Sequence, residues 1–223
     1  ASPYCLAILL AVLAVYLAKR GGWLPSLAGC LLLALSMGIY QAYAAVAVAP
    51  SLLTVLREGL TPSASLKGTA QLGLRLTGSL ALGAALYYGI LQIFLAVKDL
   101  ELLDYLGMEQ AGSGYPLARL PGLILSAYKQ VVVFFFWPGG SSSFTTPVIA
   151  GLNLALLALS VGCLIAFAVR RTLWQELWRP ISALVLAALL PLAVGFAQII
   201  SPFSDATPLM KYAYVGVYLA ALL

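Results

Sequence analysis

The longest uncharged stretch of the chain is too long to cross a membrane once as a single helix. It runs from Trp23 to Leu56 without an Asp, Glu, Lys or Arg residue. One helix of that length would span about 50 Å, whereas the hydrocarbon core of a bilayer is about 30 Å thick. The polar and aromatic cluster Gly38-Ile39-Tyr40-Gln41-Ala42-Tyr43 interrupts the stretch near its middle. The pattern therefore predicts a helical hairpin whose elbow lies at one face of the membrane.

The composition is that of an integral membrane protein. Hydrophobic residues make up 63% of the chain and charged residues 9%, and the mean hydropathy is +1.03. Apolar runs of about 20 residues favour helices, whose backbone groups bond within the segment. We predict an all-α, polytopic transmembrane bundle that forms a single domain over residues 1–223. Because the chain begins and ends in apolar runs, we expect it to be a piece of a longer polytopic protein.

The apolar runs predict about seven crossings, near residues 4–18, 24–39, 42–56, 76–97, 147–169, 181–200 and 211–223. A further apolar helix, from Leu120 to Trp137, carries the polar stripe Ser126, Lys129 and Gln130. We expect this helix to lie in the outer interface. In the fourth crossing we expect Gly78, Gly83 and Gly89 to face neighbouring helices, where small residues allow close packing.

The charge pattern predicts the orientation. With these crossings the inner segments hold eight basic and two acidic residues, whereas the outer segments hold four basic and five acidic ones. One inner segment is a polar stretch from Arg57 to Arg75. If residues 120–137 crossed fully, Arg170, Arg171 and Arg179 would move outside and the inner positive excess would disappear. The charges therefore favour an interfacial helix.

Several functions are disfavoured by the sequence. The pI is about 9.2, but the basic residues lie in short interhelical segments, so we do not expect nucleic-acid binding. The three cysteines lie in apolar runs, which is typical of packing, and without histidine a zinc site is not expected. The sequence leaves open a site at which carboxylates bind Mg²⁺ or Mn²⁺. The acidic residues that could serve as a base or metal ligand are Asp99, Glu101, Asp104 and Asp205.

The elbow is the strongest candidate for a binding site. Tyr40 and Tyr43 could form an aromatic belt at the interface or contact a ligand, whereas the Gln41 amide must find hydrogen-bond partners. The outer-face cations that could bind a phosphate, or reach lipid headgroups, are Arg119, Lys129 and Lys211. At the inner face, the arginines at positions 170, 171 and 179 could bind anionic membrane lipids, although the orientation rule already explains them.

The segment Leu35-Ser36-Met37-Gly38-Ile39-Tyr40-Gln41-Ala42-Tyr43 resembles the most recognisable segment of the serotype-converting O-antigen glucosyltransferases, which are polytopic proteins of the bacterial inner membrane. Two further stretches are similar to that family in spacing. One is Gly83 to Gly89 with its Tyr87-Tyr88 pair, and the other is Thr207 to Tyr212. In the latter the chain has Lys211 where the family pattern has arginine.

The resemblance implies a GT-C-like enzyme. Such an enzyme takes a sugar, commonly glucose, from a polyprenyl-phosphate donor and transfers it at the outer face to a glycan acceptor such as O-antigen of lipopolysaccharide. It also implies a catalytic carboxylate in the first outer loop, which would precede Ala1. Two alternatives stay open: a transporter or flippase of a lipid-linked or small polar substrate, and a non-catalytic membrane subunit.

Overall fold

The computed structural model describes all residues except 1, 101–119, 138–144, 171–175, 201–207 and 222–223. The described residues form helices and turns without a β-strand, which confirms the all-α prediction for that part of the chain. The α-helices are α1 (Pro3–Arg20), α2 (Trp23–Ile39), α3 (Ala44–Leu60), α4 (Leu66–Lys98), α5 (Leu120–Phe136), α6 (Pro147–Arg170), α7 (Trp178–Val194), α8 (Phe196–Ile200) and α9 (Val215–Ala221). Two 3-10 helices, η1 (Gln41–Tyr43) and η5 (Pro208–Tyr214), complete the order.

Three helical segments in the described part of the chain are long and apolar enough to cross a membrane. They are α1, the continuous segment Gln41–Leu60 and α4. The apolar helices α2, α5 and α7 and the apolar part of α6 are shorter than 18 residues. The number of crossings therefore stays a prediction, whereas the membrane character of the helices agrees with the sequence.

The predicted hairpin elbow is confirmed. Helix α2 ends at Ile39, and Tyr40 adopts an extended conformation with φ −158° and ψ 112°. The single turn of η1 then leads directly into α3. The Tyr40 N–H still donates to Ser36 O, and the Tyr43 N–H donates to Tyr40 O. The chain thus reverses direction while the amides of both tyrosines stay hydrogen-bonded. We call residues 40–43 the elbow.

Helices α1 and α2 pack through small side chains. The buried face of α1 consists of Ala7, Ala11, Ala14, Val15 and Ala18. At Gly29 of α2, an added Cβ would lie 2.9 Å from Ala14 O, so only glycine permits this approach. The buried Ser36 hydroxyl donates to Ala7 O at 2.7 Å. Close backbone approach and interhelical hydrogen bonds are the usual stabilising contacts between helices in lipid.

The polar stretch between Arg57 and Arg75 is mostly helical, so α4 begins well before the predicted crossing near residues 76–97. Helix α3 continues to Leu60, and α4 already begins at Leu66. Ser65 caps α4, because its hydroxyl accepts from Gly68 N at 3.1 Å. The resulting 33-residue helix is about 50 Å long. Hydropathy alone missed this start because the first turns of α4 carry the exposed polar residues Lys67, Gln71 and Arg75.

The three glycines of α4 do not share a packing face, so that prediction was wrong for two of them. Only Gly83 is buried, where an added Cβ would lie 2.8 Å from Leu33 Cδ2 and 3.2 Å from Cys30 O. At Gly78 and Gly89 an added Cβ would meet nothing within 4 Å. Residues five and six positions apart point about 140° and 120° away from one another on a helix, so they cannot meet one neighbour.

The predicted span over residues 181–200 is interrupted. Helix α7 contains Pro191 and ends at Val194, and Gly195 donates its N–H to Pro191 O at 2.9 Å before α8 begins. An added Cβ at Gly195 would lie 3.2 Å from Ala127 Cβ of α5. The break therefore lets α5 pack closely against it. The predicted last span likewise begins as the 3-10 helix η5 and becomes α-helical only at Val215.

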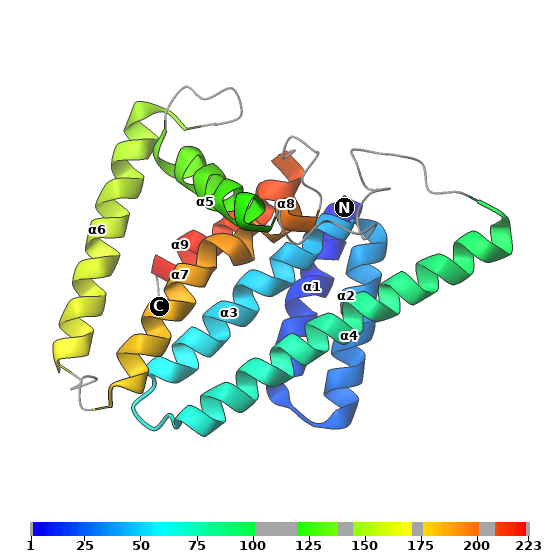
Figure 1. Cartoon of the computed structure of the whole chain (residues 1–223), viewed down its shortest axis with the longest axis horizontal. Helices are drawn as coiled ribbons and strands as arrows, with labels where there is room; N and C mark the ends of the chain where they lie inside the picture. The colour runs from blue at the N-terminus through cyan, green and yellow to red at the C-terminus, as the bar shows by residue number, and fades with distance from the viewer. Residues whose placement is uncertain (1, 101–119, 138–144, 171–175, 201–207, 222–223) are drawn as a thin grey trace.

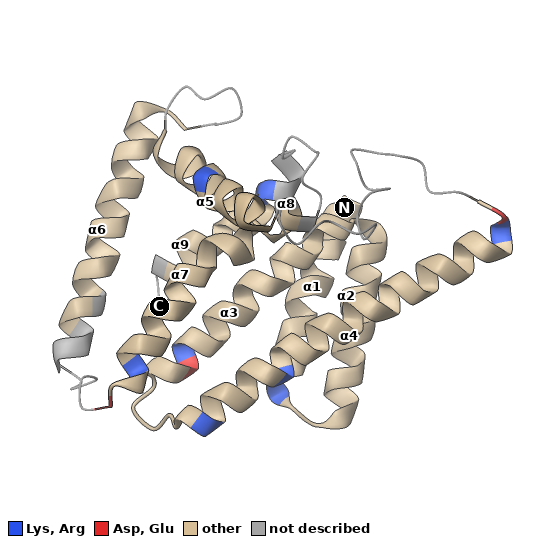
Figure 2. Cartoon of the chain, viewed as in Figure 1, with Lys and Arg blue, Asp and Glu red and all other residues tan. Residues whose placement is uncertain are grey.

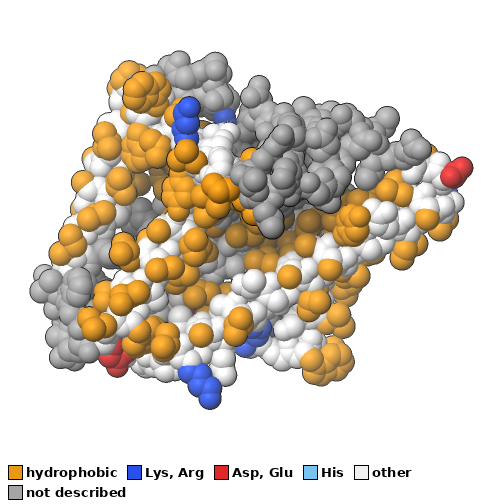
Figure 3. Space-filling model, viewed as in Figure 1, with side chains coloured by type: hydrophobic (Ala, Val, Ile, Leu, Met, Phe, Trp, Pro, Cys, Tyr) orange, Lys and Arg blue, Asp and Glu red, His pale blue; other side chains and the backbone are white. Residues whose placement is uncertain are grey.

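The helices form a bundle with two chemically different ends (Figure 1). At one end, the basic end, α1 and α3 finish and α4 and α7 begin, and most of the described Lys and Arg residues lie there (Figure 2). At the opposite end, the elbow end, the elbow lies near η5, α8 and the inclined helix α5. Large hydrophobic side chains such as Leu82, Leu152 and Leu184 are exposed on the sides of α4, α6 and α7, as expected for lipid-facing surfaces (Figure 3).

Candidate functional site

The elbow is held against α4 by a side-chain hydrogen bond. Gln41 Nε2 donates to the hydroxyl of Tyr87, a residue 46 positions later in the chain. Both side chains are half-buried. An amide in an apolar hairpin needs a polar partner, and Tyr87 is that partner. The predicted polar character of the elbow therefore has a specific structural role as well as access to the surface.

A cluster of four tyrosines, Tyr4, Tyr40, Tyr43 and Tyr212, joins α1, the elbow and η5. The ring centroids of Tyr40 and Tyr43 are 5.1 Å apart, and Tyr4 and Tyr212 lie 6.4 Å and 6.2 Å from Tyr43. All these pairs meet edge to face, which is the favoured arrangement of aromatic rings. Tyr43 is completely buried, and its hydroxyl has no hydrogen-bond partner among the described residues. The tyrosine cluster thus places phenol groups beside the elbow.

Helix η5 connects the tyrosine cluster to α5. Lys211 precedes Tyr212 and is half-buried, with its Nζ 5.6 Å from the ring centroid of Phe134 in α5. Tyr214 lies 4.9 Å from the same ring. The elbow and α5 therefore lie at the same end of the bundle, as the charge pattern predicted. Lys129 is exposed on α5, away from its buried residues, so a ligand could reach it.

Helix α6 is attached to this end by one amide. Asn153 Nδ2 donates to Phe135 O at 2.8 Å, near the end of α5, and its Oδ1 accepts from the Tyr218 hydroxyl of α9 at 3.0 Å. A carbonyl at the end of a helix lacks an intrahelical donor, so Asn153 supplies one. Asn153 therefore joins α6 to both α5 and α9.

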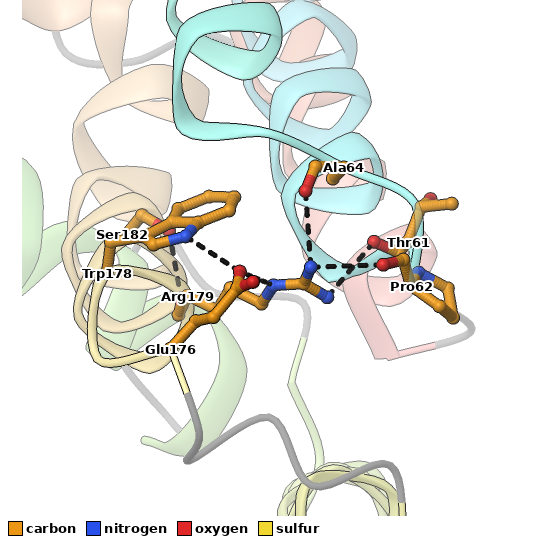
Figure 4. A network of polar contacts seen from close by, with 7 residues as sticks. All are labelled: Thr61, Pro62, Ala64, Glu176, Trp178, Arg179 and Ser182. Atoms are coloured by element: carbon orange, nitrogen blue, oxygen red, sulfur yellow. Dashed lines mark hydrogen bonds and ion pairs between the residues drawn. The ribbon is translucent and has the colours of Figure 1, made fainter.

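At the basic end, Arg179 forms the centre of a second polar cluster (Figure 4). Its guanidinium donates to Thr61 O at 3.3 Å, to Pro62 O at 3.0 Å and to Ala64 O at 3.2 Å. It also forms an ion pair of 2.7 Å with Glu176. The hydrogen bond from Arg179, and then that from the Trp178 indole, lower the pKa of the Glu176 carboxyl.

This arrangement corrects one predicted role and supports another. Arg179 is 9% exposed and its donors bind protein groups, so it is not a free cation for membrane lipids. Its contacts also place the start of α7 beside the turn between α3 and α4. With the predicted crossings, α4 and α6 would separate these two points by an even number of crossings, without α5. The geometry thus agrees with the interfacial interpretation of α5.

Comparison with protein-family models identifies the family to which this chain is related. The model of the glucosyl transferase GtrII family matches residues 2–223. The chain belongs to this family. The GtrII family is the serotype-converting O-antigen glucosyltransferase family, so the resemblance seen in residues 35–43 is confirmed. No curated protein and no solved structure matches the chain.

In this GtrII-family chain the segment that carries the resemblance forms the end of α2 and the elbow. Ser36 is used for packing against α1, whereas Gly38 is exposed and has open space where a Cβ would be. Tyr40, Gln41 and Tyr43 then form the elbow itself. The same nine residues therefore combine buried side chains at Ser36 and Tyr43 with half-buried ones at Tyr40 and Gln41.

The structure brings some of the predicted site residues together. Tyr40 and Tyr43 contact each other, and Lys211 neighbours the Tyr212 that touches Tyr43. Asp99 is exposed and ends α4 in a left-handed conformation, with φ 50°. The other predicted residues Glu101, Asp104, Arg119 and Asp205 lie outside the described residues. Within the described part of this GtrII-family chain, no three His, Cys, Asp or Glu side chains gather as metal ligands.

Sequence reasoning missed several residues that shape the elbow end. Tyr4, Tyr87 and Tyr212 were not singled out as partners of the elbow, although Tyr87 lies in a stretch that resembles the GtrII family. Each is a phenol at the surface of an apolar helix, which hydropathy also explains as interfacial. The only available signal was the unexplained Gln41 amide, which required a partner somewhere in the chain.

Proposed function

We propose that this protein transfers glucose from a polyprenyl-phosphate donor to an O-antigen glycan at the outer face of the bacterial inner membrane. The family assignment carries the proposal, because its members are glucosyl transferases that convert O-antigen serotype. The elbow end supports it, because an amide, phenol rings and lysines gather there beside apolar helices. A lipid-linked sugar has a matching order of groups: an apolar tail, a phosphate and a hydroxyl-rich ring.

The transfer needs three kinds of group in this proposal. A cation must stabilise the leaving phosphate, and Lys129 and Lys211 are the described candidates. Hydrogen-bonding groups must orient the sugar, for which we propose Gln41 and Tyr40, because Tyr43 is completely buried. A general base must accept the proton of the acceptor hydroxyl. Of the four carboxylates named for this role from the sequence, Asp99 lies within the described residues.

A transporter would need polar groups near the middle of the membrane, where a substrate could be reached from both sides. The polar clusters of the described residues instead lie at the two ends, with Gln41 and Tyr87 at one and Arg179 at the other. This distribution favours an enzyme that works at one face. A non-catalytic subunit would share the fold but would not transfer sugar.

The experiment measures glucose transfer in membranes that contain the full-length protein. Labelled polyprenyl-phosphate-glucose is the donor and O-antigen the acceptor, with and without added Mg²⁺. We expect Gln41→Ala and Lys129→Ala to lower the initial rate about tenfold or more, because each removes a group that contacts the donor. Matched controls are Gln92→Ala and Lys67→Ala, which alter an exposed amide on α4 and an exposed lysine at the basic end.

The outcomes separate the activity from its site. Lack of transfer by the wild-type protein would overturn the proposed activity. Transfer at the wild-type rate by both Gln41→Ala and Lys129→Ala would leave the activity but remove these two residues from the site. Equal losses in the variants and their controls would show a general effect of the substitutions.

A further inference from the structure

We propose that Tyr87 and Gln41 together bind one hydroxyl group of the transferred sugar, and that Tyr87 thereby determines which sugar is accepted. The proposal rests on the proposed function and assigns a role to Tyr87 that goes beyond it. Tyr87 lies on α4 and Gln41 in the elbow, and the two side chains meet through the hydrogen bond from Gln41 Nε2 to the Tyr87 hydroxyl.

Both side chains have hydrogen-bonding groups that the bond between them does not use. A glutamine amide has two N–H donors and a carbonyl acceptor, and a tyrosine hydroxyl has one donor and two acceptor sites. Because the Tyr87 oxygen accepts from Nε2, the Tyr87 O–H remains a donor. The Gln41 Oε1 remains an acceptor. Within the described part of the chain neither group makes a further hydrogen bond.

A sugar hydroxyl matches this arrangement. Its oxygen can accept from the Tyr87 O–H while its own hydrogen is donated to Gln41 Oε1. The three groups then form a closed ring of hydrogen bonds in which each hydroxyl both donates and accepts. Such rings strengthen each member in surroundings of low polarity. A hydrogen atom in place of that hydroxyl would leave both protein groups without this partner.

Access and rigidity also favour the pair. Both side chains are half-buried, so a ligand can touch them without unfolding the helices. The Tyr87 side chain packs against the main hydrophobic core, which contains Tyr43 and Leu33. The bond to Tyr87 fixes the Gln41 amide in turn. A preorganised pair discriminates better than two mobile side chains, because less motion is lost when the sugar binds.

The test combines a change in the protein with a change in the sugar. Initial rates are measured for polyprenyl-phosphate-glucose and for its 2-, 3-, 4- and 6-deoxy analogues. The proteins are wild type, Tyr87→Phe and the matched control Tyr88→Phe, whose tyrosine is the next residue on α4 and is 59% exposed. Phenylalanine keeps the ring and removes only the hydroxyl.

We expect Tyr87→Phe to lower kcat/KM for the glucose donor about tenfold, which is the size of one well-placed hydrogen bond. One deoxy donor should be equally poor for wild type and should lose nothing further in Tyr87→Phe. Gln41→Leu should show the same insensitivity to that one donor. Tyr88→Phe should behave as wild type.

Two results would overturn the proposal while leaving the proposed function intact. One is an equal loss for all five donors in Tyr87→Phe, which would indicate a purely structural role. The other is a rate for Tyr87→Phe equal to that of wild type. If the wild-type protein transfers no sugar from any donor, the proposed function fails and this inference fails with it.

Discussion

A single guanidinium group at the start of α7 holds parts of the chain that lie more than 100 residues apart. Arg179 reaches three carbonyls in the turn between α3 and α4 and also pairs with Glu176. Arginine suits this position because its planar group presents donors in several fixed directions. The carbonyls of a tight turn point in different directions, and a compact ammonium group cannot reach them all.

We therefore expect Arg179→Lys to lower the free energy of unfolding by about 2 kcal/mol, since carbonyls of the turn lose their donors. The measurement is thermal unfolding of the purified protein in detergent. The control is Arg57→Lys, because Arg57 is exposed on α3 near the same end. Its effect should stay within about 0.5 kcal/mol. Equal shifts for both variants would contradict the proposed role of Arg179.

The residue-scale contacts could be predicted only in part. Gln41 stood out because an amide in an apolar stretch must find a partner, and it does. Its partner could not be identified, because the contact between the elbow and Tyr87 depends on how α2 and α4 are rotated against each other. The charge pattern assigned Arg179 to one end of the bundle, but its partners in the turn were not predicted. Charge in the interhelical segments predicts on which side of the membrane a residue lies, whereas helix packing determines which residues it contacts.

At the scale of helices, close packing depends on which side of a helix a small residue faces. Gly83 allows α4 to approach Leu33 and Cys30 of α2, whereas Gly89 has open space around it. Both glycines lie in the same helix and in similarly apolar sequence. Composition therefore cannot distinguish them, but their angular positions on the helix can, once the packed face is known.

We expect Gly83→Val to cost about 2 kcal/mol of unfolding free energy, because the new side chain overlaps Leu33 and the Cys30 carbonyl. Gly89→Val should change stability by less than about 0.5 kcal/mol, because valine is no worse than glycine in an exposed helix. Thermal unfolding of both variants in detergent measures the difference. A loss at Gly89 as large as that at Gly83 would contradict the helix packing described here.

Most helix positions followed from the apolar runs, and the errors have identifiable causes. The elbow between α2 and α3 was predicted because polar residues interrupt an uncharged run. The first turns of α4 lie outside the predicted crossing, because a helix that extends beyond the hydrocarbon needs no apolar sequence there. The break at Gly195 was not predicted because the sequence is apolar on both sides of it, with Ala193 and Val194 before and Phe196 and Ala197 after.

At the scale of the whole molecule, the distribution of basic residues and the contacts between helices both distinguish two ends of the bundle. The described basic residues gather mainly where α3 ends and where α4 and α7 begin (Figure 2). The positive-inside rule assigns this end to the cytoplasm. Arg179 independently requires the start of α7 to share a side with the turn before α4. We therefore predict an even number of crossings between these points.

We expect single cysteines at Lys67 and Leu177 to react with a membrane-impermeant maleimide only from the cytoplasmic side. A cysteine at Lys98 should react only from the outer side. All three positions are exposed, and the measurement requires a background in which Cys5, Cys30 and Cys163 are replaced by alanine. Labelling of Leu177→Cys from the outside would show that α5 crosses the membrane, and would contradict the arrangement described here.

The two ends of the bundle are fastened in physically different ways. At the basic end, the Arg75 guanidinium donates to Lys19 O at 2.6 Å and Arg179 donates to carbonyls of the α3–α4 turn, and such hydrogen bonds weaken steeply when they are bent. At the opposite end, rings such as those of Tyr43 and Tyr212 meet edge to face, and aromatic pairs attract over about 4.5–7 Å. The elbow end should therefore tolerate small sideways displacements of its helices better than the basic end does.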